Sequence, residues 1–247
     1  MEKIDIVIIG AGIAGIASAY YLQKNFPNIR LKILESRSSV GGTWDQMSFP
    51  GVRADNDMYT YGFSFDPWNG SIIGDGKEIK NYLSKVTDKF NIKKNVLFDT
   101  EVKSLSWKDN KWIIKTDLKK FTSQYVICCT GSRDRKNPHL PKFKNEKIYQ
   151  GKIIHTQAWG NTDFKDKNVT IVGSGCTAIT MAPSIIKEAK KVTLVQRSPA
   201  WIINIDSKEK STRIYKTFQV LWDYFSSRIF KKFQRKKMIS GNTYYNE

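Results

Sequence analysis

Residues 4–15 read Ile4-Asp-Ile-Val-Ile-Ile-Gly10-Ala-Gly-Ile-Ala-Gly15, and this stretch decides the fold of the 247-residue chain. Its first six residues are mostly β-branched, which predicts a buried strand. After the glycines, apolar residues from Ile16 to Leu22 recur at helical spacing. Strand, glycine turn and helix in this order predict the opening unit of an α/β fold.

The three glycines have different expected tasks. Gly10 permits the tight turn, Gly12 lets the backbone approach a pyrophosphate, and Gly15 lets the helix pack closely on the strand. The second predicted strand, Leu31–Leu34, is followed by Glu35, 20 residues after Gly15. At this spacing a carboxylate accepts hydrogen bonds from a ribose 2′-hydroxyl and repels a 2′-phosphate. The pattern therefore predicts a Rossmann-like site for an unphosphorylated adenosine, as in FAD or NAD. A turn with a purely structural role is the alternative.

A second glycine turn, Gly173–Ala178, follows the apolar run Asn168–Val172. The next predicted strand, Val192–Gln196, is followed by Arg197 at the place that Glu35 holds in the first unit. A planar guanidinium matches a phosphate in bidentate fashion, so the second site is predicted to prefer NADPH. The alternative is an arginine on a solvated strand end.

Two residues bear on the structure of the second unit. Pro183 is expected to kink or delay the helix that follows the turn. Cys176 is expected to be a small packing residue, because no second cysteine lies at C-x-x-C spacing from it.

The segment between the two units combines glycines with aromatic residues. Gly41–Asp45 and Phe49–Asp55 lead into the aromatic stretch Met58–Phe65. Glycines let a backbone pass close to a ligand, and flat aromatic surfaces suit an isoalloxazine ring. Packing in the core or in a loop is the alternative for the same aromatic residues.

Together these motifs resemble those of the flavin-dependent Baeyer–Villiger monooxygenases, which are class B flavoprotein monooxygenases, and among them the ethionamide-activating type. The similar segments are 41–55, 57–60, 75–77, 126–132 and 196–199. The fourth is similar to the A-T-G strand of the FAD domain, and the last resembles the clamp for the NADPH phosphate. The resemblance extends from residue 4 to about residue 203.

A more specific match runs from Tyr149 to Trp159 and resembles the family fingerprint F-x-G-x-x-x-H-x-x-x-W. Tyr149 replaces the phenylalanine and Gly160 follows the tryptophan, whereas Gly151 and His155 match. The tryptophan favours this family over the N- and S-oxygenating flavin monooxygenases, which usually carry Phe or Tyr there. The resemblance implies that His155 and Trp159 form a conformational element. A linker histidine and an ordinary core tryptophan are the alternatives.

The resemblance implies that NADPH bound at the second turn reduces FAD bound at the first. A C4a-peroxyflavin then inserts one atom of O2 into a ketone. Arg53 and Asp55 are expected at the flavin–nicotinamide junction, with Asp55 positioning an arginine that stabilises the peroxide. No residue after Arg197 matches the motif that carries this arginine. An N- or S-oxygenating activity and a non-catalytic nucleotide-binding remnant stay open as alternatives.

The glycine turns and the resemblance together assign candidate cofactor residues, and no metal site is expected. For FAD they are Gly10, Gly12, Ala14, Gly15, Glu35, Gly42, Thr43, Trp44, Asp45, Asp55, Tyr61, Val102 and Gly131. For NADPH they are Gly173, Ser174, Gly175, Thr177, Ala178, Gln196 and Arg197.

The predicted fold is α/β with two Rossmann-like dinucleotide-binding units, both incomplete, and a helical C-terminal tail. The expected domains are 1–140, an FAD-binding domain without its C-terminal return; 141–205, the fingerprint linker and the start of an NADPH-binding domain; and 206–247, the tail. Members of the family are much longer, so we expect a truncated or split enzyme that is not fully active alone and a complementary C-terminal half as a partner.

The chain is strongly basic, with a formal net charge of +18. Apolar residues at helical spacing in 214–237, with a cluster of lysines and arginines, predict a basic amphipathic helix. It either contacts an anionic membrane surface or packs on the remainder of the protein. The basic residues follow no nucleic-acid-binding motif, so no nucleic-acid partner is expected. Without a secretory segment or a disulfide framework, a cytoplasmic location is expected.

Overall fold

The computed structural model describes residues 2–132, 138–198 and 202. The tail expected at 206–247, with its helical pattern at 214–237, lies outside these residues. Contacts divide the chain into two units. Unit 1 is Met1–Arg53 with Asp75–Ile202, and the described part of unit 2 is Ala54–Gly74.

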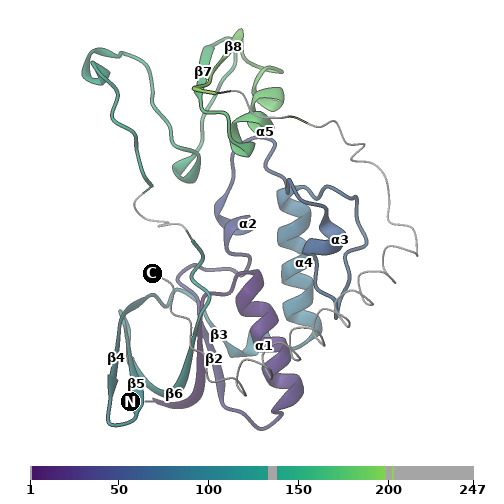
Figure 1. The fold of residues 1–247 in the computed structure, drawn as a ribbon, viewed down its shortest axis with the longest axis vertical. Helices are drawn as coiled ribbons and strands as arrows, with labels where there is room; N and C mark the ends of the chain where they lie inside the picture. The colour runs from purple at the N-terminus through teal and green to yellow at the C-terminus, as the bar shows by residue number, and fades with distance from the viewer. Residues whose placement is uncertain (1, 133–137, 199–201, 203–247) are drawn as a thin grey trace, which may run out of the picture. The chain divides into compact units, whose positions relative to one another are not determined.

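Unit 1 holds a six-stranded sheet in the order β3-β2-β1-β6-β5-β4 (Figure 1). Strands β3, β2, β1 and β6 are parallel, whereas β6, β5 and β4 form an antiparallel meander. The strands are β1 (Glu2–Ile9), β2 (Leu31–Leu34), β3 (Val96–Leu97), β4 (Val102–Lys108), β5 (Lys111–Thr116) and β6 (Lys120–Cys128). Strand β1 has a parallel partner on each side, which explains why its apolar residues are consecutive and not alternating.

Helices α1 (Ile13–Asn25) and α4 (Gly76–Lys89) contact each other in unit 1. The helix α4 begins with a capping box, in which Asp75 and Glu78 satisfy each other's backbone N–H groups. Its apolar residues fall on one side, so Ile79, Leu83 and Val86 are fully buried. The pattern is that of an amphipathic helix covering a core.

The two faces of the parallel strands have different covers. Toward α1, the Cγ2 atom of Ile8 would lie 3.5 Å from a Cβ placed on Gly15. Val7 on the other side packs in a cluster with Ile114 and Phe121 of the meander. The parallel strands therefore lie between a helix and the inner face of the meander.

A second sheet consists of two parallel strands, β7 (Asn168–Val172) and β8 (Lys191–Val195), joined by helix α5 (Cys176–Ile185). Ile171 and Leu194 are paired in register and pack in a cluster with Met181. Among the described residues β7 has β8 as its one partner in a sheet. The predicted delay by Pro183 is wrong, because α5 begins directly after the turn. Pro183 lies in its last turn, where it cannot donate to the carbonyl of Ile179, and the helix ends two residues later.

In unit 2, Asp57 caps the short helix α3 (Met58–Tyr61) by accepting hydrogen bonds from the backbone N–H groups of Tyr59 and Thr60. The rings of Phe63 and Phe65 stack with centroids 4.8 Å apart. The aromatic stretch thus packs within its own unit, as its structural alternative predicts. The remaining short elements are α2 (Thr43–Gln46), η1 (Lys93–Asn95), η2 (Glu146–Ile148) and η3 (Thr156–Ala158).

The predicted α/β fold with two Rossmann-like units is confirmed by the two strand–turn–helix–strand arrangements β1-α1-β2 and β7-α5-β8. None of the helices in residues 2–132 and 138–198 has the length and apolarity that crossing a bilayer requires.

Candidate functional site: two dinucleotide turns

The first glycine turn joins β1 to α1 and is tightly packed. Gly10 has a φ of +101°, and a Cβ there would lie 2.4 Å from the carbonyl oxygen of Cys129. A Cβ on Gly15 would lie 1.9 Å from the carbonyl oxygen of Gly10. Gly12 has more room, because its nearest neighbour is the Cα of Gly42 at 3.6 Å. The first and last glycines are therefore required by packing, and Gly12 is the one that leaves space for a ligand.

Glu35 follows β2 and lies beside this turn. Its side chain is buried, with 1% exposure. One carboxylate oxygen accepts a hydrogen bond of 2.7 Å from the backbone N–H of Ala11, and the other accepts one of 2.9 Å from the N–H of Arg37. The structure therefore brings the predicted acidic residue to the predicted phosphate turn and fixes it there.

The segment Gly41–Asp45 also meets the first turn. The backbone N–H of Gly41 donates to the carbonyl of Ala11 at 3.0 Å, and Thr43 begins α2. The carboxylate of Asp45 is 6% exposed and accepts hydrogen bonds from Ser39, Arg37 and Lys80. Two cations and a hydroxyl thus hold the segment in place through one buried carboxylate.

This cluster changes the acidity of its central carboxyl. Burial alone would raise the pKa of Asp45, but the hydrogen bonds from Lys80, Ser39 and Arg37 outweigh burial, and the pKa is lowered from its ordinary value of 3.8. Sequence reasoning selected Asp45 but missed Arg37 and Lys80, since a partner on another element leaves no local pattern.

We predict that Asp45→Asn lowers the free energy of unfolding by about 2 kcal/mol at pH 7, because charge-assisted hydrogen bonds are replaced by weaker neutral ones. A lowered native pKa contributes stability that is present above the ordinary value and is lost as the pH falls through the native value. The difference between the proteins should therefore shrink below pH 4. Urea unfolding at a series of pH values measures it. A difference that stays constant down to the acid transition would contradict the assigned role of the charge.

Other predicted FAD residues occupy varied places. Ala14 lies in the first turn of α1, Val102 begins β4 and packs against the meander core, and Gly131 follows β6 with a φ of +80°. Trp44 is half-buried in α2. Their assignment to FAD stays a prediction.

Arg53 and Asp55 fall on opposite sides of the boundary between the units. Arg53 is exposed and forms an isolated antiparallel bridge with Asp75 in unit 1. Asp55 is exposed and Tyr61 is half-buried, both in unit 2. Their expected roles at a flavin–nicotinamide junction stay predictions.

The second glycine turn differs from the first because it is open. Gly173 has a φ of +137°, and a Cβ on Gly173 or Gly175 would meet no atom within 4 Å. Gly175 is the N-cap of α5 and has no side chain that could cap the first N–H groups of the helix. A helix N-terminus of this kind binds anions.

Arg197 lies directly beyond β8 and is exposed, as is Gln196. The backbone N–H of Gly173 donates to the carbonyl of Val195 at 2.9 Å, which places the end of β8 beside the second turn. The same bond in the first unit runs from Gly10 to the carbonyl of Leu34, so Gln196 takes the place of Glu35 and Arg197 follows it by one residue. Cys176 is exposed at the start of α5, so the prediction that it is a packing residue is wrong.

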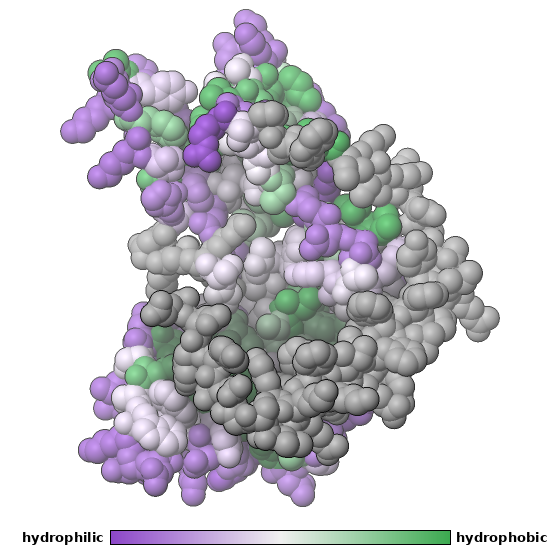
Figure 2. All heavy atoms as spheres, in the orientation of Figure 1, coloured by the Kyte–Doolittle hydropathy of each residue, from purple (hydrophilic) through white to green (hydrophobic). Residues whose placement is uncertain are grey.

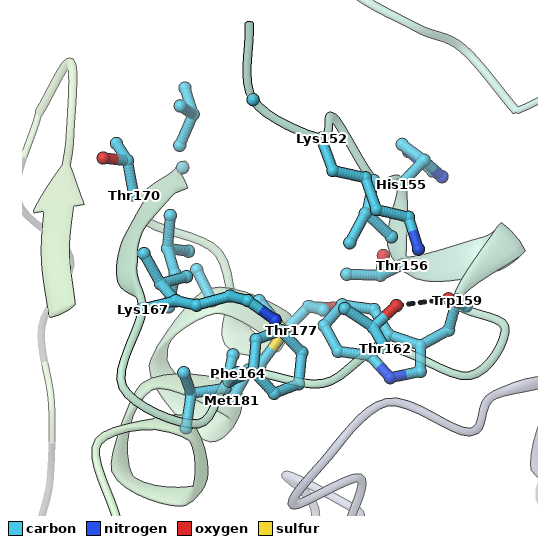
Figure 3. A pocket seen from close by; sticks show the side chains of 18 of the residues that line it. Lys152, His155, Thr156, Trp159, Thr162, Phe164, Lys167, Thr170, Thr177 and Met181 are labelled. Carbon is cyan, nitrogen blue, oxygen red and sulfur yellow. Dashed lines mark hydrogen bonds between the residues drawn. The ribbon is translucent and has the colours of Figure 1, made fainter. Parts of the chain in front are cut away.

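The fingerprint segment, Tyr149–Trp159, lies against β7 and α5 around a cavity of about 630 Å³ (Figure 3). The cavity is lined by His155 and Trp159 of the fingerprint and by Gly173, Gly175 and Thr177 of the second turn. Figure 3 shows Trp159, Thr162 and Phe164 close together, with the Thr162 hydroxyl donating to the Trp159 carbonyl at 3.2 Å. The remaining turn residues differ in burial, because Ala178 is buried and Ser174 is half-buried.

His155 and Trp159 have contacts that fit a conformational element. The Nδ1 atom of His155 accepts a hydrogen bond of 3.2 Å from the N–H of Gln157 and so caps η3. The ring of Trp159 contacts Phe49 at 6.4 Å between centroids and Phe164 at 5.4 Å. Trp159 thus links the segment after the first nucleotide turn to the core formed with β7, α5 and β8.

Comparison with known proteins agrees with this arrangement. Residues 7–222 match the family model described as pyridine nucleotide-disulphide oxidoreductase. The chain is 41% identical over 218 residues to a probable FAD-binding monooxygenase, AlmA, of an Acinetobacter species, which covers 84% of this chain and 44% of AlmA. It is 38% identical over 212 residues to the FAD-containing monooxygenase EthA of Mycobacterium tuberculosis, covering 82% of this chain and 43% of EthA.

Solved structures are similar as well. A steroid monooxygenase in its oxidised form bound to NADP is 30% identical with a TM-score of 0.70, over 79% of this chain and 39% of the other. A cyclohexanone-bound cyclohexanone monooxygenase is 25% identical with a TM-score of 0.77, over 92% of this chain and 45% of the other. The chain spans less than half the length of these relatives. It belongs to the pyridine nucleotide-disulphide oxidoreductase family.

Proposed function

We propose that this chain is the FAD- and NADPH-binding half of a Baeyer–Villiger-type flavoprotein monooxygenase. The observation that carries the proposal is the repetition of one nucleotide-binding geometry with opposite charges after the second strand. Glu35 is buried beside the first turn, and Arg197 is exposed two residues beyond β8. The relatives named as FAD-containing monooxygenases and the steroid monooxygenase bound to NADP support this choice of cofactors.

The residues of the first turn fit FAD. Gly12 has more room around it than Gly10 and Gly15, and it is the N-cap of α1, whose first N–H groups can bind a phosphate. The carboxylate of Glu35 has lone pairs left after its two backbone hydrogen bonds and can accept from ribose hydroxyls. When bound, FAD supplies the redox chemistry and the activation of oxygen. The protein residues supply binding and orientation.

The residues of the second turn fit NADPH. The open positions at Gly173 and Gly175 leave room for a pyrophosphate that the start of α5 can bind. The exposed guanidinium of Arg197 can form a bidentate pair with a 2′-phosphate, which a neighbouring carboxylate would repel. This pairing favours NADPH over NADH.

The contacts of Trp159 suggest how the fingerprint acts. Its ring packs on Phe49 and Phe164, and both phenylalanines are buried. A shift of the fingerprint on binding of NADPH would therefore move the segment that leads to Arg53. His155 accepts a backbone hydrogen bond at Nδ1 and caps η3, which is a structural task.

The proposed reaction inserts one oxygen atom of O2 into a ketone, and it requires a second polypeptide segment. Within the part of the chain that the structure describes, the sheet of β7 and β8 has two strands, whereas parallel sheets are normally wider and covered on both faces. We propose that a complementary C-terminal half adds further strands to this sheet. It would also supply the peroxide-stabilising arginine, whose motif has no match after Arg197. Consumption of NADPH that depends on a ketone, after the two halves are mixed, tests this. Turnover with sulfides or amines but not ketones would select the N- or S-oxygenating alternative.

Cofactor binding can be tested without turnover. We predict that the purified chain binds 2′,5′-ADP, and that Arg197→Gln weakens this binding about 30-fold, since a hydrogen-bonded charge pair contributes roughly 1.5–3 kcal/mol. Binding of 5′-AMP, which lacks the second phosphate, should be the same for both proteins. Isothermal titration calorimetry measures both. Equal affinity of the two proteins for 2′,5′-ADP would remove Arg197 from the proposed site.

A further inference from the structure

Arg37 lies two residues after Glu35 and is bonded to both Glu35 and Asp45. Its backbone N–H donates to one carboxylate oxygen of Glu35 at 2.9 Å, while the N–H of Ala11 donates to the other at 2.7 Å. Its side chain donates from Nε to Oδ2 of Asp45 and from Nη2 to the carbonyl oxygen of Asp45 at 3.3 Å. Arg37 therefore joins the carboxylate that is proposed to bind the ribose to a second carboxylate on α2.

These residues and the first glycine turn form a closed ring of contacts. Ala11 donates its N–H to Glu35, and its carbonyl oxygen accepts a hydrogen bond of 3.0 Å from the N–H of Gly41. Asp45 lies four residues beyond Gly41 in the same segment. Arg37 closes the ring, because it bonds to Asp45 with its side chain and to Glu35 with its backbone. In a satisfied network of this kind each group limits the movement of the next, so the orientation of Glu35 is set from two sides.

The charge of Asp45 is buried inside this ring. Figure 2 shows hydrophilic side chains on the outer surface, for example over β4 and β5, whereas the Asp45 side chain is 6% exposed. A buried carboxylate needs hydrogen-bonded partners that compensate it. Its Oδ2 atom accepts from Arg37, and its Oδ1 atom contacts the Ser39 hydroxyl and the Lys80 ammonium. The two cations therefore act on different oxygens, and the Arg37 side is the one that leads on to Glu35.

We propose that Arg37 is a positioning residue for the adenosine ribose of FAD, on which it acts through Glu35. The inference rests on the proposed function, because it needs FAD at the first turn. The side chain of Arg37, anchored on Asp45, holds the backbone N–H that orients the Glu35 carboxylate. The remaining lone pairs of that carboxylate can then accept from the ribose hydroxyls. The carbonyl of Arg37 accepts from the N–H of Asp99 at 3.1 Å, so part of the anchoring survives loss of the side chain.

The test compares ADP with 2′-deoxy-ADP, which lacks the hydroxyl that Glu35 would bind. Both nucleotides are titrated against the full chain with FAD bound, and the fluorescence of released FAD reports each affinity at the first turn. The ratio of the two affinities cancels any general change in FAD binding. The unaltered chain should prefer ADP about tenfold, as expected for one hydrogen bond to a charged group. Arg37→Gln should reduce this preference to about threefold, since the bond from Asp99 remains.

Lys80→Gln is the matched control. It removes one cation from the same buried carboxylate, so its unfolding temperature should fall about as much as that of Arg37→Gln. Its preference for ADP should nevertheless stay at about tenfold, because the link from Asp45 to Glu35 is intact. A third variant, Arg37→Lys, keeps the charge but donates from one nitrogen, so it should show an intermediate preference. This variant also serves as the test if Arg37→Gln does not fold.

The outcomes separate this inference from the proposed function. An unaltered chain that binds no FAD, or that releases it equally with ADP and 2′-deoxy-ADP, would contradict binding of the FAD ribose by Glu35 and so the proposed function of the first turn. A clear preference that persists in Arg37→Gln, or that Lys80→Gln reduces equally, would leave that function standing and overturn the role of Arg37. Weaker binding of both nucleotides at an unchanged ratio would overturn it too, because the guanidinium would then act on a phosphate directly.

Discussion

Gly15→Ala is expected to lower the free energy of unfolding by about 3 kcal/mol, at the upper end of the usual cost of overpacking. The added Cβ would lie 1.9 Å from the carbonyl oxygen of Gly10 and 3.5 Å from a methyl group of Ile8. The oxygen belongs to a backbone turn, which cannot rotate away as a side chain can. Helix α1 must therefore move off β1, and the contact between helix and strand is lost over its first turn. Urea unfolding followed by circular dichroism measures the change.

The control for this variant is Gly12→Ala. The nearest atom to its added Cβ is 3.6 Å away, which is an ordinary van der Waals distance. We expect a loss of stability below about 1 kcal/mol, in line with a glycine that is not closely packed. Binding of FAD should nevertheless fall, because the methyl group occupies the space above the turn. If both variants lost the same stability, packing would not distinguish the two glycines.

Glu35→Ala is expected to have the second large effect, a loss of about 3 kcal/mol in unfolding free energy. The change leaves the N–H groups of Ala11 and Arg37 without their acceptor in a buried place, and each unsatisfied group costs about 1–3 kcal/mol. FAD should then bind poorly for two reasons, a loosened turn and a missing acceptor for the ribose. Thermal unfolding and fluorescence titration with FAD measure the two effects.

The isosteric Glu35→Gln separates the two roles of this residue. It keeps one acceptor and replaces the other by an amide that cannot accept from a backbone N–H. We expect about half the loss of stability that alanine causes, in keeping with one broken hydrogen bond in place of two. An unchanged stability in both variants would show that the two N–H groups find water, and that the carboxylate serves the ligand alone.

Much of the architecture is predictable because its causes are local in sequence. The strands expected at 31–34 and 168–172 have those bounds in the structure, since Glu35 follows the first and Gly173 follows the second. The helices after both glycine turns are equally local. The meander strands β4 and β5 were not predicted. Their apolar residues face a core that forms only when residues far apart in the sequence meet, and their outer face is made of lysines that are typical of loops.

The candidate sites divide in the same way. Glu35 and Arg197 are predictable because each comes just after the second strand of a strand–turn–helix–strand unit. The cluster of Arg37 and Lys80 around Asp45 joins residues 8 and 35 positions apart and depends on the packing of α4. The contact of Trp159 with Phe49 spans more than a hundred residues. Such contacts need the tertiary structure, since no period or spacing encodes them.

Strand β7 has a single neighbour in the part of the chain that the structure describes. This limits the concentration at which the protein should stay soluble. A free edge offers a row of N–H and C=O groups to any extended chain, including another copy of the same strand. At low concentration, and with a strand partner supplied quickly, the β7 edge should pair with that partner. At high concentration without such a partner, the protein should precipitate. The yield of soluble protein as a function of concentration would report how well that edge is covered.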